Sequence, residues 1–520
     1  MSSPPAARVR TASQITGLLR RERWQIVVVG LGAAVVAAVM LPWLPGRDQG
    51  IEAATALAIL RGAVPYRDVW NHNLPGGFLS LAMAFALVGK SPVTIRFLDV
   101  LSLAIAAGAT ASLGQRVAPR LGWLLAPTVL VLSYVGHGDP WNTAQRDGYL
   151  LPLGAAALAL VVSSQRPRTA LAAGVLVGVA ALFKPGGLII IAPILALTRG
   201  RARLLTVAGA AAPALLLAFY LAGTGATGSF LECVVSFNRT YARHFEAFQG
   251  RQDASLWKMF GHFVLGRPEL WLAIPGAIQL RRSSLRTPLL LYLAAGLASA
   301  MFQAGLYPYH LLPLLAPIAV LSAGVMRALP SAGRVRTWLI WAAVAGLLAP
   351  SGYRWTGHAW QAVRVATGAT TPAQRRSALR TPDFRYADIA QLSLILRERT
   401  EPGEPVLVWG IDPLVHFLSQ RAPVTRFPTD LPLRTDGIAD SVRPEFLRQL
   451  SGRWPRFVAI QKADVVPWMT GNNSDSLAAA GSFPELREVL ERDYAMTVSL
   501  PTWLLLQRKD TIRLPPVPTP

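Results

Sequence analysis

The chain has 520 residues, of which 52% are hydrophobic and only 15% are charged, and its formal net charge is +23. Apolar runs recur over the first two thirds of the sequence, which excludes an ordinary soluble protein and indicates a polytopic membrane protein. The basic residues lie in short clusters between these runs, so anchoring at the membrane surface explains the charge better than nucleic-acid binding does. We therefore expect membrane lipids, and no nucleic acid, among its partners.

A membrane-spanning helix needs roughly 20 apolar residues, and fewer where neighbouring helices compensate. The first run, 26–44, is long for a signal peptide and no small-residue cleavage site follows it, so we interpret it as a retained anchor. The sequence predicts eleven spans, near 25–45, 93–115, 121–136, 148–163, 169–184, 186–198, 204–222, 259–280, 287–303, 308–327 and 337–353.

The charges between the spans decide whether a twelfth apolar stretch, 75–89, also crosses the membrane. If it stays on one side, six alternate loops hold 18 arginines against one acidic residue, Glu22. Basic loops remain in the cytoplasm. We therefore predict that 75–89 is a re-entrant or interfacial helix, that the N-terminus is cytoplasmic, and that the region after the eleventh span lies outside.

Ionisable side chains gather in the predicted outer loops. Asp48, Asp139, Asp147 and Lys184 each lie within a few residues of a predicted helix end. Charged groups at membrane depth are costly and are usually paired or functional. Any chemistry is therefore expected at the outer face.

The order of several short motifs carries a resemblance to a known family. Asp48 follows the first span, GAVPYRD occupies 62–68, HNLPG occupies 72–76, and Arg96 begins the next span. Further pieces in the same order are AQRD at 144–147, FKP at 183–185, YHLLP at 309–313 and the stretch 402–427. This series resembles the GT-C superfamily of integral-membrane glycosyltransferases. The most similar branch is the bacterial one related to protein mannosyltransferases, aminoarabinose transferases and lipopolysaccharide galacturonosyltransferases.

The resemblance implies transfer of a sugar from a polyprenyl-phosphate donor to a glycan, lipid or protein acceptor of the cell envelope, on the outer face of a bacterial cytoplasmic membrane. Asp48 matches the family's first-loop aspartate, so it is expected to act as the general base that accepts the proton of the attacking hydroxyl. The alternative is that Asp48 only caps the helix that follows it.

Other residues are assigned roles on the same resemblance. Asp139 and Asp147 compete for the place of a second catalytic acid. Lys184 is the expected cation for the donor phosphate, with Arg146 and Arg243 as further candidates; its alternative is a lysine that extends to water from a helix end. Residues that we expect to contact substrate are Glu52, Asp68, His72, Tyr309 and His310. Glu52 would share a helix face with Asp48, and its alternative is an acidic residue that only complements the helix dipole.

The sequence leaves the use of a divalent metal ion open. Some relatives place a carboxylate just before the proline that follows the first outer helix, but this chain has His72 and Asn73 there. No cysteine cluster or H-E-x-x-H motif offers another site, so no metal ligand is predicted and no cofactor is certain.

Two domains are expected. Residues 1–353 form the GT-C transmembrane domain, which is an α-helical polytopic membrane domain with its first outer loop at 46–92. In residues 354–520 short apolar runs alternate with helical patterns, which predicts a small extracytoplasmic α/β domain that positions the acceptor or covers the site.

Two other functional classes fit parts of the pattern. A transporter or flippase of lipid-linked sugars would also have many helices, but it should carry polar groups along a path through the membrane. An O-antigen ligase or polymerase would share the lipid-linked chemistry but would place its outer mass in a loop between spans. The gathering of polar residues at one face favours the glycosyltransferase.

Overall fold

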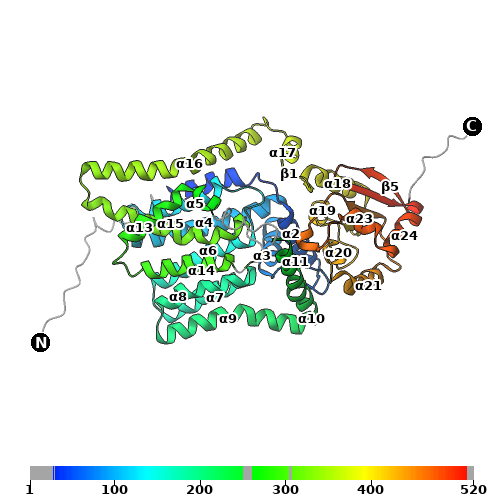
Figure 1. Ribbon diagram of the computed structural model, residues 1–520, viewed down its shortest axis with the longest axis horizontal. Helices are drawn as coiled ribbons and strands as arrows, with labels where there is room; N and C mark the ends of the chain where they lie inside the picture. Colours follow the sequence, from blue (N-terminus) through cyan, green and yellow to red (C-terminus); the bar gives the residue numbers. More distant parts are fainter. Residues whose placement is uncertain (1–26, 29, 250–260, 302, 304–306, 512–520) are drawn as a thin grey trace, which may run out of the picture.

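The computed structural model describes residues 27–511 except for 29, 250–260, 302 and 304–306. A bundle of helices and a part built around a β-sheet lie side by side along the long axis of the molecule (Figure 1). The basic cluster predicted before the first span lies outside the described residues.

The helical part consists, in chain order, of a helix at Gly30–Met40, α2 (Arg47–Leu60), α3 (Gly76–Val88), α4 (Pro92–Val117), α5 (Gly122–Gly136), α6 (Arg146–Ser163), α7 (Pro167–Phe183), α8 (Ile191–Leu197), α9 (Gly200–Gly223), α10 (Thr227–Phe230), α11 (Phe237–Gln249), α13 (Ala273–Gln279), α14 (Arg286–Met301), α15 (Leu315–Ala323) and α16 (Arg334–Ala366). Shorter segments continue several of these helices: η1 (Pro185–Ile190), η2 (Leu231–Ser236), η3 (Pro268–Leu272), η4 (Pro308–Leu314) and η5 (Gly324–Ser331).

Among the described residues, four helices are long and apolar enough to cross a membrane: α4, α6, α9 and the stretch Pro308–Ser331. Most of the other predicted spans contain helices of fewer than 18 residues, and the predicted span 337–353 lies within the longer helix α16. The ranges 25–45, 259–280 and 287–303 lie partly outside the described residues. The number of eleven spans therefore stays a prediction.

Helix α3 corresponds to the stretch that we expect not to cross. Its 13 residues extend for about 20 Å at 1.5 Å per residue, whereas the hydrocarbon core of a bilayer is about 30 Å thick. It packs closely on α2 at Gly77, where an added Cβ atom would lie only 2.6 Å from Glu52 Oε2. This close approach explains why the last residue of the HNLPGG sequence, Gly77, is a glycine.

Helix α16 differs from the predicted eleventh span, which was expected to end at residue 353. Its 33 residues form one continuous helix to Ala366, about 50 Å long. The predicted domain boundary at 353/354 therefore falls inside this helix. Hydrophobicity ends near Tyr353, but the backbone hydrogen bonds continue, so loss of apolar residues does not mark the end of the helix.

The sheet part begins with a two-residue hairpin, β1 (Arg380–Thr381) and β2 (Phe384–Arg385). A four-stranded sheet follows in the order β3-β4-β6-β5, with β3 and β4 parallel and the other pairs antiparallel. Its strands are β3 (Leu407–Trp409), β4 (Phe457–Gln461), β5 (Tyr494–Ser499) and β6 (Trp503–Arg508).

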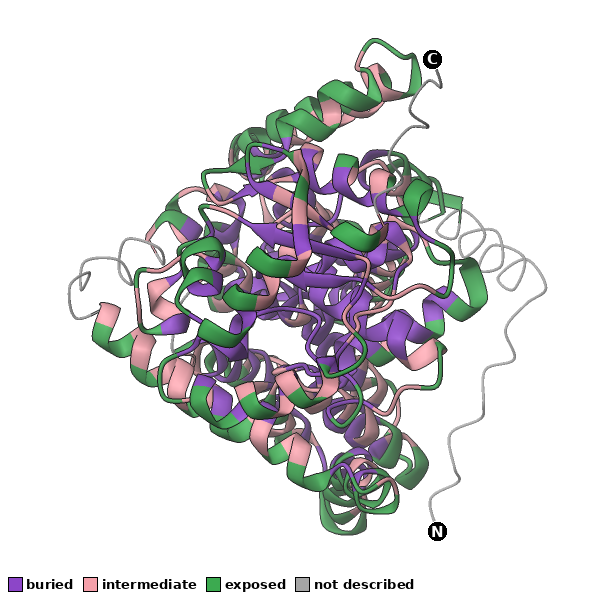
Figure 2. Ribbon diagram, turned by 90° about the vertical axis from the view of Figure 1, so that its right-hand side faces the viewer, coloured by how far each residue is buried: buried purple, intermediate pink, exposed green. Residues whose placement is uncertain are grey.

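Helices α17 to α24 surround this sheet: α17 (Pro372–Ala378), α18 (Tyr386–Arg399), α19 (Leu414–Ser419), α20 (Leu431–Arg434), α21 (Ala439–Leu450), α22 (Pro467–Thr470), α23 (Ser476–Gly481) and α24 (Pro484–Asp493). Strands β3 and β4 are buried along their whole length. Figure 2, seen from the sheet end, shows buried strands in the centre with exposed helices around them. The alternation of strands and helices predicted in residues 354–520 is therefore present between residues 380 and 508, whereas a separate C-terminal domain and its extracytoplasmic location stay predictions.

The two parts meet at helix α2, which packs against α19. A Cβ atom added at Gly50 would lie 2.8 Å from Leu414 Cβ. The rings of Phe85 and Phe417 stack nearby with centroids 5.3 Å apart. These contacts fix α2 against the sheet part.

Candidate active site

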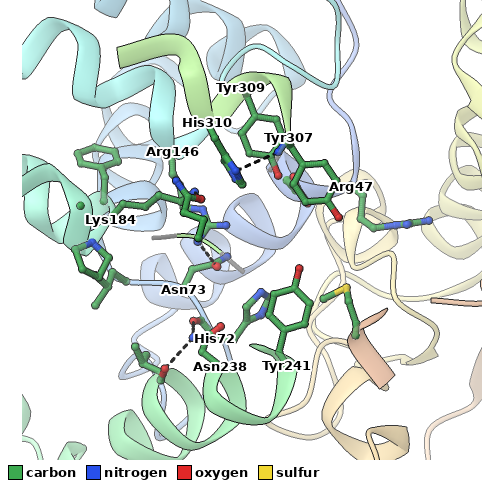
Figure 3. A pocket seen from close by; sticks show the side chains of 18 of the residues that line it. Arg47, His72, Asn73, Arg146, Lys184, Asn238, Tyr241, Tyr307, Tyr309 and His310 are labelled. Carbon is green, nitrogen blue, oxygen red and sulfur yellow. Dashed lines mark hydrogen bonds between the residues drawn. The ribbon is translucent and has the colours of Figure 1, made fainter. Parts of the chain in front are cut away.

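A cavity of about 630 Å³ lies at this junction. Its lining comes from the start of α2, the loop after α2, the start of α6, the α7–η1 junction, α11, α14, η4 and α22 (Figure 3). Segments separated by more than 400 residues thus contribute to a single site.

Asp48 lies in the first turn of α2, is half-buried and lines the cavity. Gln145 Nε2 donates a hydrogen bond of 3.1 Å to its Oδ2. The N-cap of α2 is Gly46, whose backbone N–H donates to Gln49 Oε1 at 2.7 Å. The alternative that Asp48 caps the helix is therefore wrong, because the helix starts before it and the side chain of Gln49 folds back instead.

Glu52 lies one turn after Asp48 but is buried behind the cavity wall. Asn73 Nδ2 donates to its Oε1 at 2.8 Å, and Arg146 Nε lies 3.7 Å from the same oxygen. Burial raises the pKa of Glu52 to about 7, although Arg146 and Asn73 oppose this shift. Through these two contacts Glu52 holds Asn73 and Arg146, which line the cavity.

Arg146 begins α6 and lines the cavity. It donates a hydrogen bond to Asn73 Oδ1 (Figure 3). Asn73 therefore bridges Glu52 and Arg146, accepting from the arginine with its oxygen and donating to the carboxylate with its nitrogen. This chain fixes the direction of a guanidinium that lies about one-fifth exposed in the cavity.

Lys184 and Asp147 form an ion pair, with 2.7 Å between Nζ and Oδ2. Gln303 joins both: its Nε2 donates to Asp147 Oδ1 at 3.2 Å, and its Oε1 accepts from Lys184 Nζ. The lysine ammonium also lies 5.9 Å from the centroid of the Tyr309 ring. Lys184 is therefore held in the cavity wall by protein contacts. The alternative, a lysine that extends to water from a helix end, does not describe it.

Besides Glu52 and Asp147, three further predicted site residues lie away from the cavity lining. Asp139 accepts from the backbone N–H groups of Trp141 and Asn142 at 2.7 and 2.8 Å and so closes a turn. Asp68 pairs with Arg67 at 2.8 Å on the surface. Arg243 is an exposed residue of α11.

The predicted residues His72, Tyr309 and His310 do line the cavity. Burial, together with Arg146, lowers the pKa of His72 to about 3, so its ring is neutral. Tyr309 stacks on Tyr307 with centroids 5.4 Å apart and planes 5° apart, and the Tyr307 N–H donates to His310 Nδ1 at 3.2 Å.

The structure adds lining residues that sequence reasoning missed. They are Arg47, Asn73, Asn142, Asn238, Tyr241, Gln303, Tyr307, Trp468 and Met469. Asn73 lies in the motif HNLPG and Tyr307 lies two residues before the motif YHLLP, so the sequence could have indicated both. Tyr241 and Trp468 were not, because α11 and α22 meet only through the fold.

The described residues include no group of three or more histidine, cysteine or acidic side chains that could hold a metal ion. His72 and Asn73 precede the proline at the start of α3, and the buried Nδ1 of His72 has no hydrogen-bond partner among the described residues. Asn238 donates to the His72 carbonyl at 2.7 Å, and Asn73 bridges Glu52 and Arg146. Metal use therefore stays an open prediction.

Comparison with known proteins gives one family and several solved structures. The model of glycosyltransferase family 87 matches residues 75–304. ArnT from Cupriavidus metallidurans, solved bound to undecaprenyl phosphate, is 14% identical with a TM-score of 0.51, over 94% of this chain and 99% of that chain. The Archaeoglobus fulgidus oligosaccharyltransferase in complex with Zn and sulfate is 13% identical with a TM-score of 0.48, over 84% of this chain and 68% of that chain.

A third solved structure, the arabinosyltransferase EmbB from Mycobacterium smegmatis, is 14% identical with a TM-score of 0.45, over 72% of this chain and 43% of that chain. No curated protein gives a significant sequence match. The similarity to ArnT shows a shared fold. Together with the family match it confirms the predicted resemblance to GT-C glycosyltransferases and supports a membrane glycosyltransferase.

Proposed function

We propose that this protein transfers a sugar from a polyprenyl-phosphate donor to an acceptor of the bacterial cell envelope, at the outer face of the cytoplasmic membrane. One observation carries the proposal. A single cavity is lined by the carboxylate of Asp48 and by two cations, Arg146 and Lys184, that are each held by an ion pair. The structure of ArnT contains undecaprenyl phosphate, which supports a donor of this chemical class.

In this proposal Asp48 is the general base. As the acceptor oxygen attacks the anomeric carbon, its proton passes to the Asp48 carboxylate, while the bond from the anomeric carbon to the phosphate oxygen breaks and its electron pair leaves with the phosphate. The amide of Gln145 orients the carboxylate. Direct displacement of this kind inverts the configuration of the sugar.

Arg146 and Lys184 are assigned to the donor phosphate, which gains negative charge as the sugar leaves. Cations that are already oriented stabilise such charge without reorganising at the moment of reaction. Here the orientation comes from Asn73 and Glu52 for Arg146, and from Asp147 and Gln303 for Lys184. An ion pair such as Asp147–Lys184 also lowers the cost of keeping the lysine charged in a mostly buried position.

Purified protein offered a panel of polyprenyl-phosphate sugars tests the proposal. We expect release of polyprenyl phosphate from at least one donor, by transfer or by slow hydrolysis, and loss of this release in Asp48→Asn. Asp68→Asn is the matched control, because Asp68 lies in the same loop but outside the cavity. Equal rates in the two variants, or no release from any donor, would reject the proposal.

A further inference from the structure

Arg47 stands next to Asp48, in the same helical turn, and connects this turn to the sheet part. Its Nη1 donates to Asp383 Oδ2 at 2.9 Å, its Nη2 donates to the Asp383 carbonyl at 3.1 Å, and its Nε donates to Asp412 Oδ1. Asp383 lies in the β1–β2 hairpin and Asp412 follows β3. One guanidinium therefore fastens the start of α2 to two segments more than 330 residues later in the chain.

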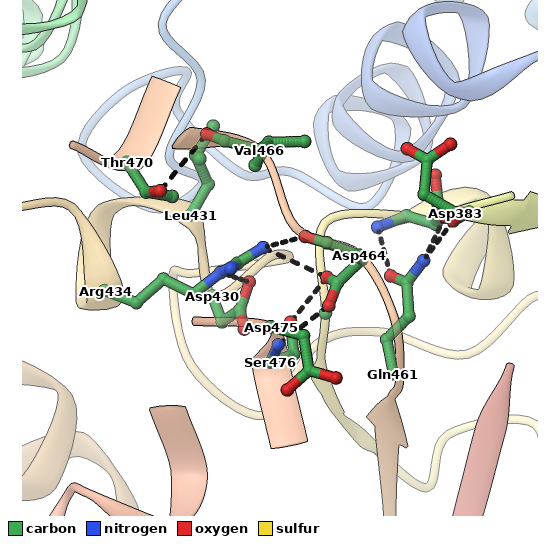
Figure 4. Close-up of polar contacts among 12 residues, drawn as sticks. Asp383, Asp430, Leu431, Arg434, Gln461, Asp464, Val466, Thr470, Asp475 and Ser476 are labelled. Carbon is green, nitrogen blue, oxygen red and sulfur yellow. Dashed lines mark hydrogen bonds and ion pairs between the residues drawn. The ribbon is translucent and has the colours of Figure 1, made fainter. Parts of the chain in front are cut away.

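The sheet side of this contact is buried and held by further hydrogen bonds. Asp412 is fully buried, and Gln461, the last residue of β4, donates with Nε2 to Asp412 Oδ2 and to the Asp383 carbonyl while its Oε1 accepts from the Asp412 N–H. Figure 4 shows Gln461 directed at Asp383 from the end of its strand. We call Arg47, Asp383, Asp412 and Gln461 the Arg47 network.

The Arg47 network is arranged to fix position. Arg47 lines the cavity, but its single positive charge is already paired with two carboxyl groups, those of Asp383 and Asp412. A guanidinium that bonds two partners through a planar fork restricts both direction and distance, which an ammonium cannot do. The close approach of Gly50 to Leu414 limits movement of the same turn from the other side.

We propose that Arg47 is a positioning residue that transmits the placement of the sheet part to the carboxylate of Asp48. The sheet part then sets the rate of sugar transfer, and the donor is bound by the separate cations Arg146 and Lys184. This inference rests on the proposed role of Asp48. A reacting group must be held within about half an ångström of its working position, and a displacement of about 1 Å can cost 10²-fold in rate.

The test uses the full-length protein and measures kcat and the donor KM separately. Arg47→Ala and Asp412→Asn should each lower kcat about tenfold or more and leave the donor KM within about twofold. Arg47→Lys should recover only part of the loss, and it gives the same comparison if Arg47→Ala cannot be purified. Arg61→Ala is the control, because Arg61 links the other end of α2 to the sheet part through the Gln420 carbonyl at 2.8 Å and should not change kcat.

A double-mutant cycle separates positioning from general support of the fold. If Arg47 acts through Asp48, then Arg47→Ala should cause little further loss in an Asp48→Asn background, since the positioned group is already absent. A further tenfold loss in that background would overturn the inference, as would a parental kcat in Arg47→Ala. A parent protein that releases no polyprenyl phosphate from any donor would instead reject the proposed function, and the inference with it.

Discussion

Asp48→Asn separates the chemical role of this carboxylate from its structural contribution. The substitution keeps the size of the side chain, and the new amide oxygen can still accept from Gln145 Nε2. Because the N-cap is Gly46, the change removes no cap. It removes one negative charge from the first turn of α2, which costs about 0.3–1 kcal/mol of helix stability, and it weakens one hydrogen bond by about 1 kcal/mol.

The expected loss of activity is much larger than this structural cost. A missing general base lowers the rate by about 10² to 10⁴, and a 10²-fold loss corresponds to about 2.7 kcal/mol of transition-state free energy. The assay compares release of polyprenyl phosphate with the thermal unfolding of the same preparation. A well-folded variant that keeps more than about a third of the parental rate would refute the role of Asp48.

Three other predictions address the donor site, the buried wall and the topology. Lys184→Ala should lower kcat/KM for the lipid-linked sugar, because it removes a few kcal/mol of transition-state stabilisation. The same release assay measures this change. Unchanged kinetics would leave Lys184 without a role at the phosphate. Burial raises the pKa of Glu52 from 4.5 to about 7, so the stability associated with its protonated form is complete below about pH 4.5 and is lost as the pH rises through about 7. The melting temperature of Glu52→Gln should therefore fall less than that of the parent between pH 5 and pH 8. A reporter fused after Arg336 should remain cytoplasmic and one fused at Pro520 should be exported; the reverse result at either point would contradict the eleven-span prediction.

The order of short motifs predicted much of the cavity lining, because each motif lies at or beside the end of a helix. Asp48, His72, Arg146, Lys184 and Tyr309 all line it. These residues stand where a polar side chain interrupts an apolar pattern, and such an interruption is visible in the sequence alone.

Pairing between the motifs was not predictable in the same way. Asp147 and Lys184 were assigned separate roles, yet they form one ion pair. Asp139 was a competing acid, yet it closes a local turn. A local pattern shows that a helix ends, but which helix ends meet depends on the packing of the whole bundle.

Comparison of the three carboxylates near Arg146 and Lys184 explains why Asp48 is the best candidate base. Asp147 is almost completely buried and forms an ion pair with Lys184, so its lone pairs are directed at a cation. Glu52 is buried, lies behind Asn73 and does not line the cavity. Asp48 lines the cavity, its hydrogen-bond donor is the neutral amide of Gln145, and no salt bridge to it is found within the described part of the chain. A base needs both access to the acceptor hydroxyl and an oxygen that no cation already occupies, and of the three only Asp48 has both.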